Sequence, residues 1–187
     1  MKDALSMDMP ANASPEATTI SGTPHAIIVM GVCGTGKSTI GIKLAQTLSW
    51  RYFDADDFHP AANVAKMRAG TPLTDDDRAP WLDALRDHLA AHPASVLACS
   101  ALKLRYRQHL RSAAPNIQFV FLHGTRDLLA SRLGAREGHY MPSSLLDSQL
   151  AALEAPSPEE AIWCDIAPPP AIIVKTALTG LGLGKPH

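Results

Sequence analysis

Short apolar runs and longer stretches with one apolar face alternate along the chain. The runs contain many β-branched residues and are typical of strands buried on both faces of a sheet. They predict strands at 26–30, 51–53, 95–99, 117–122 and 161–166. In the intervening stretches apolar residues recur every three or four positions, as on one face of a helix. These stretches predict helices at 39–48, 60–69, 75–92, 104–112, 126–135, 143–153 and 171–181. Thr74 is the expected N-cap of the helix at 75–92, and Asp75 and Asp76 in its first turn are interpreted as helix-start charge.

The order of these elements predicts an α/β fold, a three-layer, doubly wound sheet of about five parallel strands. Helices separate the successive strands, and right-handed crossovers place them on both faces of the sheet. Residues 1–24 are rich in Ala, Pro, Ser and Thr and predict a disordered tail. We therefore expect a single domain over 25–187, with a helical substrate-binding insertion at 57–92 and a lid at about 134–144.

The stretch 31–39, GVCGTGKST, has the spacing of a phosphate-binding loop. Gly31 directly follows the first predicted strand, and four residues separate it from Gly36, Lys37 and Ser38. Glycines let successive backbone N–H groups turn towards one phosphate, and the following helix points its N-terminus at the same anion. We expect Lys37 to reach the β- and γ-phosphates of a nucleotide, and the Ser38 hydroxyl to bind Mg²⁺.

Two arginines are candidates for a second side of the nucleotide site. Arg132 and Arg136 lie four residues apart on one helix face, where their repulsion would be offset by an anionic ligand. A Gly-containing crossing follows them, so we expect a lid that closes over ATP. The complete set of predicted ATP-binding residues is Gly31, Val32, Cys33, Gly34, Thr35, Gly36, Lys37, Ser38, Thr39, Arg132 and Arg136.

Three carboxylates follow the second predicted strand, at Asp54, Asp56 and Asp57. Ligands of open α/β sheets bind at the carboxyl ends of the strands, so this group is a source of a metal ligand and a base. An alternative is that these residues only begin a helix, with Asp57 or His59 as the cap and Pro60 in the first turn. The two interpretations are compatible.

The third predicted strand carries no carboxylate where many phosphate-loop ATPases and GTPases have one. Cys99 and Ser100 occupy that position, so the acid on the metal side must come from elsewhere, and Asp54 and Asp56 are the nearest candidates. This difference argues against a motor or a switch protein.

Charge and cysteine content exclude several other classes of protein. Among the 187 residues, 17 Lys and Arg balance 18 Asp and Glu, so no basic excess favours nucleic acid or an anionic membrane. No apolar run approaches the roughly 20 residues of a membrane span. The three cysteines Cys33, Cys99 and Cys164 lie far apart, which favours a reduced, cytoplasmic setting and suggests no zinc site.

The chain resembles the gluconate kinase family, small phosphate-loop kinases related to shikimate kinase and adenylate kinase. The matching stretches are GVCGTGKST, DADDFHP, NVAKMRAGTPLTDDDRAPWL, CSALKLRYRQHLR, SRLGAREGHYM and LLDSQLAALEAP, which spread over residues 31–156. The phosphate loop occurs in many enzymes, whereas the KMRAG-PL-DDDR-PWL block and CSALK are far more specific. Cys33, Gln108 and Tyr140 depart from the residues usual in the family.

The resemblance implies Mg²⁺-dependent transfer of a phosphoryl group from ATP to gluconate, giving 6-phosphogluconate for the pentose phosphate or Entner–Doudoroff route, by a homodimer. Hydroxyls of such an acceptor would bond to carboxylate and imidazole groups, and its carboxylate to Lys or Arg. The predicted catalytic residues are Lys37, Asp56 and Arg132. The predicted substrate-binding residues are Asp56, His59, Arg68, Lys103, Arg107 and His139.

The related shikimate kinases have an Asp-x-Asp pair after the second strand, whose second member contacts the substrate. By this resemblance Asp56 is the base. Asp54 directly follows the strand, close to the phosphate loop and Ser38, so we expect Asp54 and Ser38 to bind the metal and Asp57 to cap the next helix. Two alternatives remain open: another acceptor on the same fold, such as shikimate, a nucleoside monophosphate or adenylylsulfate, and a nucleotide-binding regulator without an acceptor.

Overall fold

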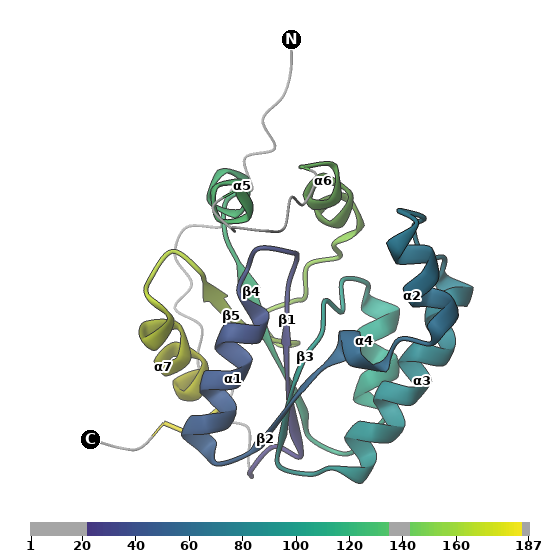
Figure 1. Cartoon of the computed structure of the whole chain (residues 1–187). Helices are drawn as coiled ribbons and strands as arrows, with labels where there is room; N and C mark the ends of the chain where they lie inside the picture. Colours follow the sequence, from purple (N-terminus) through teal and green to yellow (C-terminus); the bar gives the residue numbers. More distant parts are fainter. Residues whose placement is uncertain (1–21, 135–142, 185–187) are drawn as a thin grey trace.

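The computed structural model describes residues 22–134 and 143–184 (Figure 1). Its central sheet has five strands in the order β2-β3-β1-β4-β5, and all neighbouring strands run parallel. The strands are β1 (Ala26–Met30), β2 (Arg51–Asp54), β3 (Ser95–Ala98), β4 (Ile117–His123) and β5 (Ile162–Asp165). The predicted doubly wound α/β fold is confirmed.

The central position of β1 follows from its apolar sequence. All five of its residues are buried, as expected for a strand with neighbours on both sides and helices on both faces. Ala26 lies opposite Ser95 of β3 and Ile117 of β4. The sheet extends from β1 to β2 and β3 on one side and to β4 and β5 on the other. Ligands of such sheets bind beyond the carboxyl ends of the strands at this switch point, where the loop from Gly31 begins.

Helices cover both faces of the sheet (Figure 1). On one face lie α1 (Lys37–Leu48) and α7 (Pro170–Gly180), and on the other lie α3 (Asp75–Ala91) and α4 (Leu104–Arg111). Ile27 and Val29 of β1 belong to the core cluster under α1 and α7. Ile28 and Met30 belong to the second cluster, under α3 and α4. Alternate side chains of one strand therefore hold two helical layers together.

The remaining helices lie towards the edge of the sheet where β1 ends. In Figure 1, α5 (Arg126–Gly134) and α6 (Ser143–Ala152) lie above the strands. The 3₁₀ helix η1 (Ala55–Phe58) and α2 (Ala61–Arg68) follow β2. The predicted boundaries of helices and strands agree with the structure to within two residues, apart from η1, which was not predicted.

The prediction that Asp57 caps a helix is wrong. Residues after β2 form η1, and its N-cap is Asp54, whose side chain accepts a hydrogen bond from the Asp56 backbone N–H at 3.1 Å. α2 begins only after Pro60, which has no side-chain group to cap it, so His59 is not the cap either. The 3₁₀ helix brings the cap position forward by three residues.

α3 starts in the predicted helical insertion and continues along the sheet. Its predicted cap is confirmed: Thr74 Oγ1 accepts from the Asp77 backbone N–H at 3.2 Å, and the Asp77 carboxylate accepts from the Thr74 N–H at 2.9 Å. Further along, Trp81, Leu85 and Leu89 are buried against the sheet. The buried face of α3 packs on the sheet, and this packing fixes the position of its capped start in the insertion.

Some predictions concern residues outside the described ranges. Most of the predicted tail and lid lies there, as do Arg136 and His139. Within the described ranges no helix is both long and apolar enough to span a bilayer.

Candidate active site

The phosphate loop turns back sharply at glycines whose conformations other residues resist. Gly31 has φ 144°, and a Cβ atom there would lie 2.5 Å from the backbone oxygen of Leu122. Gly36 has φ 88° and is the N-cap of α1, and it supplies no side chain to cap the helix. A Cβ at Gly36 would meet no atom within 4 Å. The N-terminus of α1 is thus left for a ligand, and helix N-termini favour anions.

Contacts within the loop converge on the carbonyl group of Val32. The Thr35 hydroxyl donates to this oxygen at 2.8 Å, and Lys37 Nζ donates to it at 3.1 Å. Desolvation lowers the pKa of Lys37, while Cys99, Cys33, Asp56 and Asp54 act in the opposite direction. The ammonium group is therefore held against the loop, beside the carboxylates after β2.

Asp54 and Ser38 come together at the end of β2. Ser38 Oγ donates to Asp54 Oδ2 at 3.2 Å, and the Tyr52 hydroxyl donates to the same oxygen at 3.0 Å. A hydroxyl and a carboxylate are the oxygen ligands that Mg²⁺ prefers, so this pair fits the predicted metal site. Among the described residues no cluster of three His, Cys, Asp or Glu side chains could hold a metal ion. The protein therefore offers a partial ligand set, and phosphate oxygens and water would complete it.

Asp56 and His59 follow Asp54 in the chain, and the pKa values of both side chains are shifted. Desolvation and the neighbouring Asp54 carboxylate raise the pKa of Asp56, against the effects of His59 and Lys37. Desolvation lowers the pKa of His59, Asp56 opposes this change, and Arg78 lowers it further. A carboxylate with a raised pKa is a better proton acceptor in general-base catalysis.

The His59 ring is held in place by neighbours from α2 and α3. It stacks on Trp81, with ring centroids 4.5 Å apart and planes 9° apart. Trp81 Nε1 donates to the Ala55 carbonyl oxygen at 2.7 Å, which fixes the indole under η1. Buried Asn63 lies 3.5 Å from His59 Nδ1 and donates to the Asp77 carbonyl oxygen at 2.7 Å. The acid segment is thus tied to both helices of the insertion.

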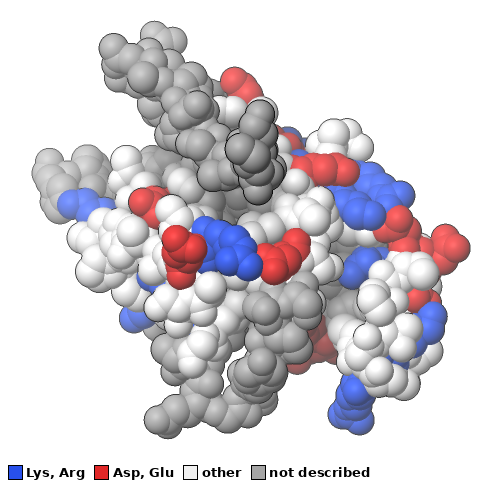
Figure 2. Space-filling model, turned by 90° about the horizontal axis from the view of Figure 1, so that it is seen from above, with Lys and Arg blue, Asp and Glu red and all other residues white. Residues whose placement is uncertain are grey.

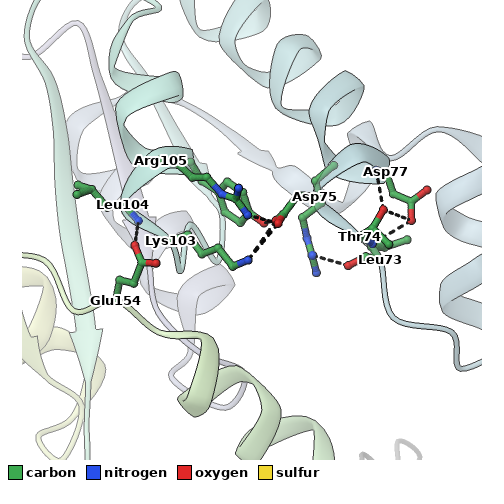
Figure 3. Close-up of polar contacts among 10 residues, drawn as sticks. Leu73, Thr74, Asp75, Asp77, Lys103, Leu104, Arg105 and Glu154 are labelled. Carbon is green, nitrogen blue, oxygen red and sulfur yellow. Dashed lines mark hydrogen bonds and ion pairs between the residues drawn. The ribbon is translucent and has the colours of Figure 1, made fainter.

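Asp75 joins the start of α3 to the start of α4 (Figure 3). Its carboxylate accepts from Lys103 Nζ at 3.2 Å and also contacts Arg105 and the Tyr106 hydroxyl. Hydrogen bonds from Tyr106 and Arg105 hold the pKa of Asp75 well below its usual range. The sequence predicted a helix-start charge here, and the structure adds a cross-helix contact. Lys103, a predicted substrate ligand, is therefore paired with a protein carboxylate.

The structure does not support the prediction that Arg107 binds substrate. Its side chain is buried, and it forms a two-pronged ion pair with Glu160, with Nε–Oε1 at 2.6 Å and Nη2–Oε2 at 3.1 Å. Nη1 donates to three carbonyl oxygens, those of Ala101, Leu102 and Glu154. These contacts direct the guanidinium into the protein, where it fixes the 153–160 segment to α4.

The Arg107–Glu160 ion pair makes a prediction about stability. We expect Arg107→Met to lower the free energy of unfolding by about 3–5 kcal/mol, because it leaves the Glu160 side chain, which is only 15% exposed, without its cation. Urea denaturation would measure this loss. Arg86→Met is the matched control at the surface, with an expected change within about 0.5 kcal/mol. An Arg107→Met protein of parental stability with a raised KM for the acceptor would restore the original prediction.

Two other predicted arginines lie in different settings. Arg132, on α5, donates through Nη2 to the carbonyl oxygen of Ile166 at 2.6 Å. The next residue, Leu133, lies close to Gly34 of the phosphate loop, so this part of α5 borders the nucleotide site. Arg68 is exposed at the C-terminal end of α2, 12 residues after Asp56 in the sequence.

Charges of both signs are mixed on the face above the strands. Figure 2, viewed from above, shows acidic and basic side chains next to one another on the described surface of this face. Arg126 of α5 forms an ion pair with Asp147 of α6 at 2.8 Å. The local mixture matches the near-neutral composition of the chain.

Sequence reasoning missed several residues that shape the site. They are Tyr52, which bonds to Asp54; Asn63 and Trp81, which hold His59; and Gln149, which bonds to the phosphate loop. Trp81 had a signal, since it lies with Leu85 and Leu89 on the apolar face of its helix. Asn63 and Gln149 act through contacts 14 and 116 residues away in the sequence, which no local pattern records. Tyr52 lies only two residues before Asp54, and this spacing places both on one face of a strand.

Comparisons with known proteins agree with this geometry. A family model described as shikimate kinase matches residues 33–160. A gluconokinase from Gluconobacter oxydans (strain 621H) is 50% identical over 143 residues, which cover 74% of this chain and 80% of the relative. The thermosensitive gluconokinase of Escherichia coli (strain K12) is 43% identical over 140 residues, covering 73% and 75%.

Solved structures give the same result. A gluconokinase from Sinorhizobium meliloti 1021 has 48% sequence identity and a TM-score of 0.80, covering 85% of this chain and 92% of that one. A shikimate kinase from Bacteroides thetaiotaomicron, 18% identical, has a TM-score of 0.63 over 84% and 98% and shares the fold. The chain therefore belongs to the gluconokinase family of kinases, within the wider group that the shikimate kinase family model describes.

Proposed function

We propose that this kinase transfers the γ-phosphoryl group of ATP to the 6-hydroxyl of D-gluconate, giving 6-phospho-D-gluconate. The observation that carries the proposal is the 48–50% identity to gluconokinases over most of the chain. The cluster of Lys37, Ser38, Asp54 and Asp56 at one edge of the sheet supports the same reaction. It combines a cation, metal ligands and a base, which phosphoryl transfer requires.

Each group in this cluster has a proposed part in the reaction. Lys37 neutralises charge on the phosphoryl group as it moves, and the phosphates in turn favour the protonated form of its amine. Ser38 and Asp54 would hold Mg²⁺, which screens the charge of the phosphate oxygens. Asp56 orients the acceptor hydroxyl and takes its proton as the new bond to phosphorus forms. Arg132 is proposed to contact the phosphates after releasing the Ile166 carbonyl group.

The acceptor is proposed to bind between η1, α2 and the start of α4. His59 bonds to its hydroxyl groups, and Lys103 attracts its carboxylate. Lys103 already donates a hydrogen bond to the Asp75 carboxylate. When the acceptor binds, Lys103 would donate to both carboxylates or leave Asp75 for the carboxylate of the acceptor. Arg68 and His139 complete the proposed substrate ligands.

Assembly is proposed from the resemblance to gluconate kinases, and location from the three widely spaced cysteines, which favour a reducing setting. We expect a homodimer in the cytoplasm. Light scattering on the purified protein tests the first statement, since a monomer at micromolar concentration would contradict it.

The substrate prediction is tested by coupled detection of ADP. The assay uses Mg-ATP with gluconate, shikimate, AMP and adenylylsulfate in turn, under identical conditions. We expect turnover with gluconate alone, because the chain is 48–50% identical to gluconokinases and only 18% identical to a shikimate kinase of the same fold. Turnover with shikimate or AMP but not gluconate would place the enzyme on another acceptor. ATP hydrolysis that ignores all four would instead indicate a nucleotide-dependent regulator.

A further inference from the structure

We propose that Gln149, on α6, is a positioning residue for the phosphate loop and, through that loop, for Lys37. The side-chain oxygen Oε1 of Gln149 accepts a hydrogen bond from the backbone N–H of Cys33 at 2.7 Å. The two residues are 116 positions apart in the chain. The proposal rests on the ATP-binding half of the proposed function and does not depend on which acceptor is used.

The peptide unit between Val32 and Cys33 is held at both of its polar groups. Its N–H donates to Gln149, and its carbonyl oxygen accepts from the Thr35 hydroxyl and from Lys37 Nζ. A peptide unit is planar, so a partner that fixes the direction of its N–H also fixes the direction of its C=O. Gln149 thereby sets the orientation of the carbonyl group that holds the Lys37 ammonium.

Burial makes this contact necessary for the loop. Val32 and Cys33 are 3% and 8% exposed, so water has little access to replace the Gln149 oxygen. A buried N–H without a partner is unfavourable, and the loop can relieve it by rotating the Val32–Cys33 peptide unit towards another acceptor. That rotation also carries the carbonyl oxygen away from Lys37.

The position of α6 relative to the loop is fixed by packing. Leu146 lies three residues before Gln149, on the same helix face, and is buried in the core cluster that also contains Val32 and Cys33. On the neighbouring side, a Cβ atom at Gly34 would lie 3.0 Å from Leu133 Cγ of α5. The loop is thus packed by one helix and hydrogen-bonded by the next.

Two substitutions separate the hydrogen bond from the packing. Gln149→Met keeps the length of the side chain and removes the acceptor, whereas Gln149→Glu keeps an acceptor oxygen. We expect kcat at saturating ATP to fall about 10-fold in Gln149→Met and to stay within about three-fold of the parent in Gln149→Glu. The KM for gluconate should be unchanged in both. Ser148→Ala, at the exposed neighbouring position, is the control and should behave like the parent.

Parental kcat and KM for ATP in Gln149→Met would overturn the proposal, as would equal losses in the Met and Glu variants. A second measurement uses the unaltered protein and needs no acceptor. The Cys33 amide should be protected from hydrogen exchange before nucleotide is added, and rapid exchange would overturn the proposal whatever the variants do. A protected amide with ATP binding by calorimetry but no gluconate turnover would leave the role of Gln149 standing and contradict only the proposed acceptor.

Discussion

Replacing Lys37 by Met is expected to lower turnover by about 10²-fold or more while the protein stays folded. The transferring phosphoryl group is stabilised mainly by preorganised positive charge, and Lys37 is the cation that the phosphate loop itself supplies. The loop already holds its Nζ atom 3.1 Å from the Val32 carbonyl oxygen, so little reorganisation is needed when ATP binds. Steady-state kinetics with saturating ATP and gluconate would measure the loss.

The structure offers a matched control for Lys37. Lys43 lies on the same helix and is exposed, so Lys43→Met removes one positive charge of α1 without touching the loop. We expect its kinetics and its melting temperature to match the parent. An active, folded Lys37→Met protein would show that the loop cation does not act on the phosphoryl group.

Replacing Asp56 by Asn is expected to lower turnover by roughly 10²-fold or more, with ATP affinity close to that of the parent. The change keeps the shape of the side chain and removes the group that takes the acceptor proton. It also leaves the backbone N–H of Asp56 free to bond to Asp54, so η1 should keep its cap. Calorimetric titration with ATP, together with the rate of ADP formation, separates binding from chemistry.

The acidic limb of the pH profile gives an independent test of Asp56. Its pKa is raised, mainly by desolvation and then by Asp54, so its basic form is lost at a higher pH than for an ordinary carboxyl group. Activity should therefore fall as the pH drops through that raised pKa. The limb should disappear in the residual activity of Asp56→Asn, and an unchanged limb would assign it to another group.

Neighbouring carboxylates provide the controls for this assignment. Asp54→Asn should raise the Mg²⁺ concentration needed for half-maximal activity, because Asp54 faces the Ser38 hydroxyl. Asp57→Asn should be mild, since Asp57 is exposed and caps no helix. A dead Asp57→Asn with an active Asp56→Asn would move the base by one residue.

Local patterns predicted the parts of the fold that depend on short stretches of sequence. β1 and the phosphate loop follow from an apolar run and a glycine spacing, and the cap at Thr74 follows from the carboxylates that fill the first turn after it. The 3₁₀ helix after β2 was missed because Asp54 bonds to Asp56 over two residues, a contact that resembles an ordinary helix start in sequence.

The sequence did not predict the parts of the site that depend on contacts between residues far apart in the chain. Arg107 has the charge of a substrate ligand, and only Glu160, 53 residues further on, shows that it is an internal ion pair. The role of Asp75 depends in the same way on Lys103, which lies 28 residues away. A single sequence gives no sign of which charges meet, since a surface arginine and a buried one have the same local pattern.

The bracing of the phosphate loop has a consequence for biosynthesis. The phosphate loop, residues 31–38, is synthesised before most of the elements that surround it. Its strand, β1, lies between β3 and β4, and the loop itself contacts Leu133 and Gln149. Domains assemble as their chains are completed, and contacts over long sequence distances form late. A nascent chain that ends before residue 149 would carry the whole nucleotide-binding motif without the Gln149 acceptor. Nucleotide affinity in ribosome-bound chains of increasing length should therefore appear only after α6 has left the exit tunnel.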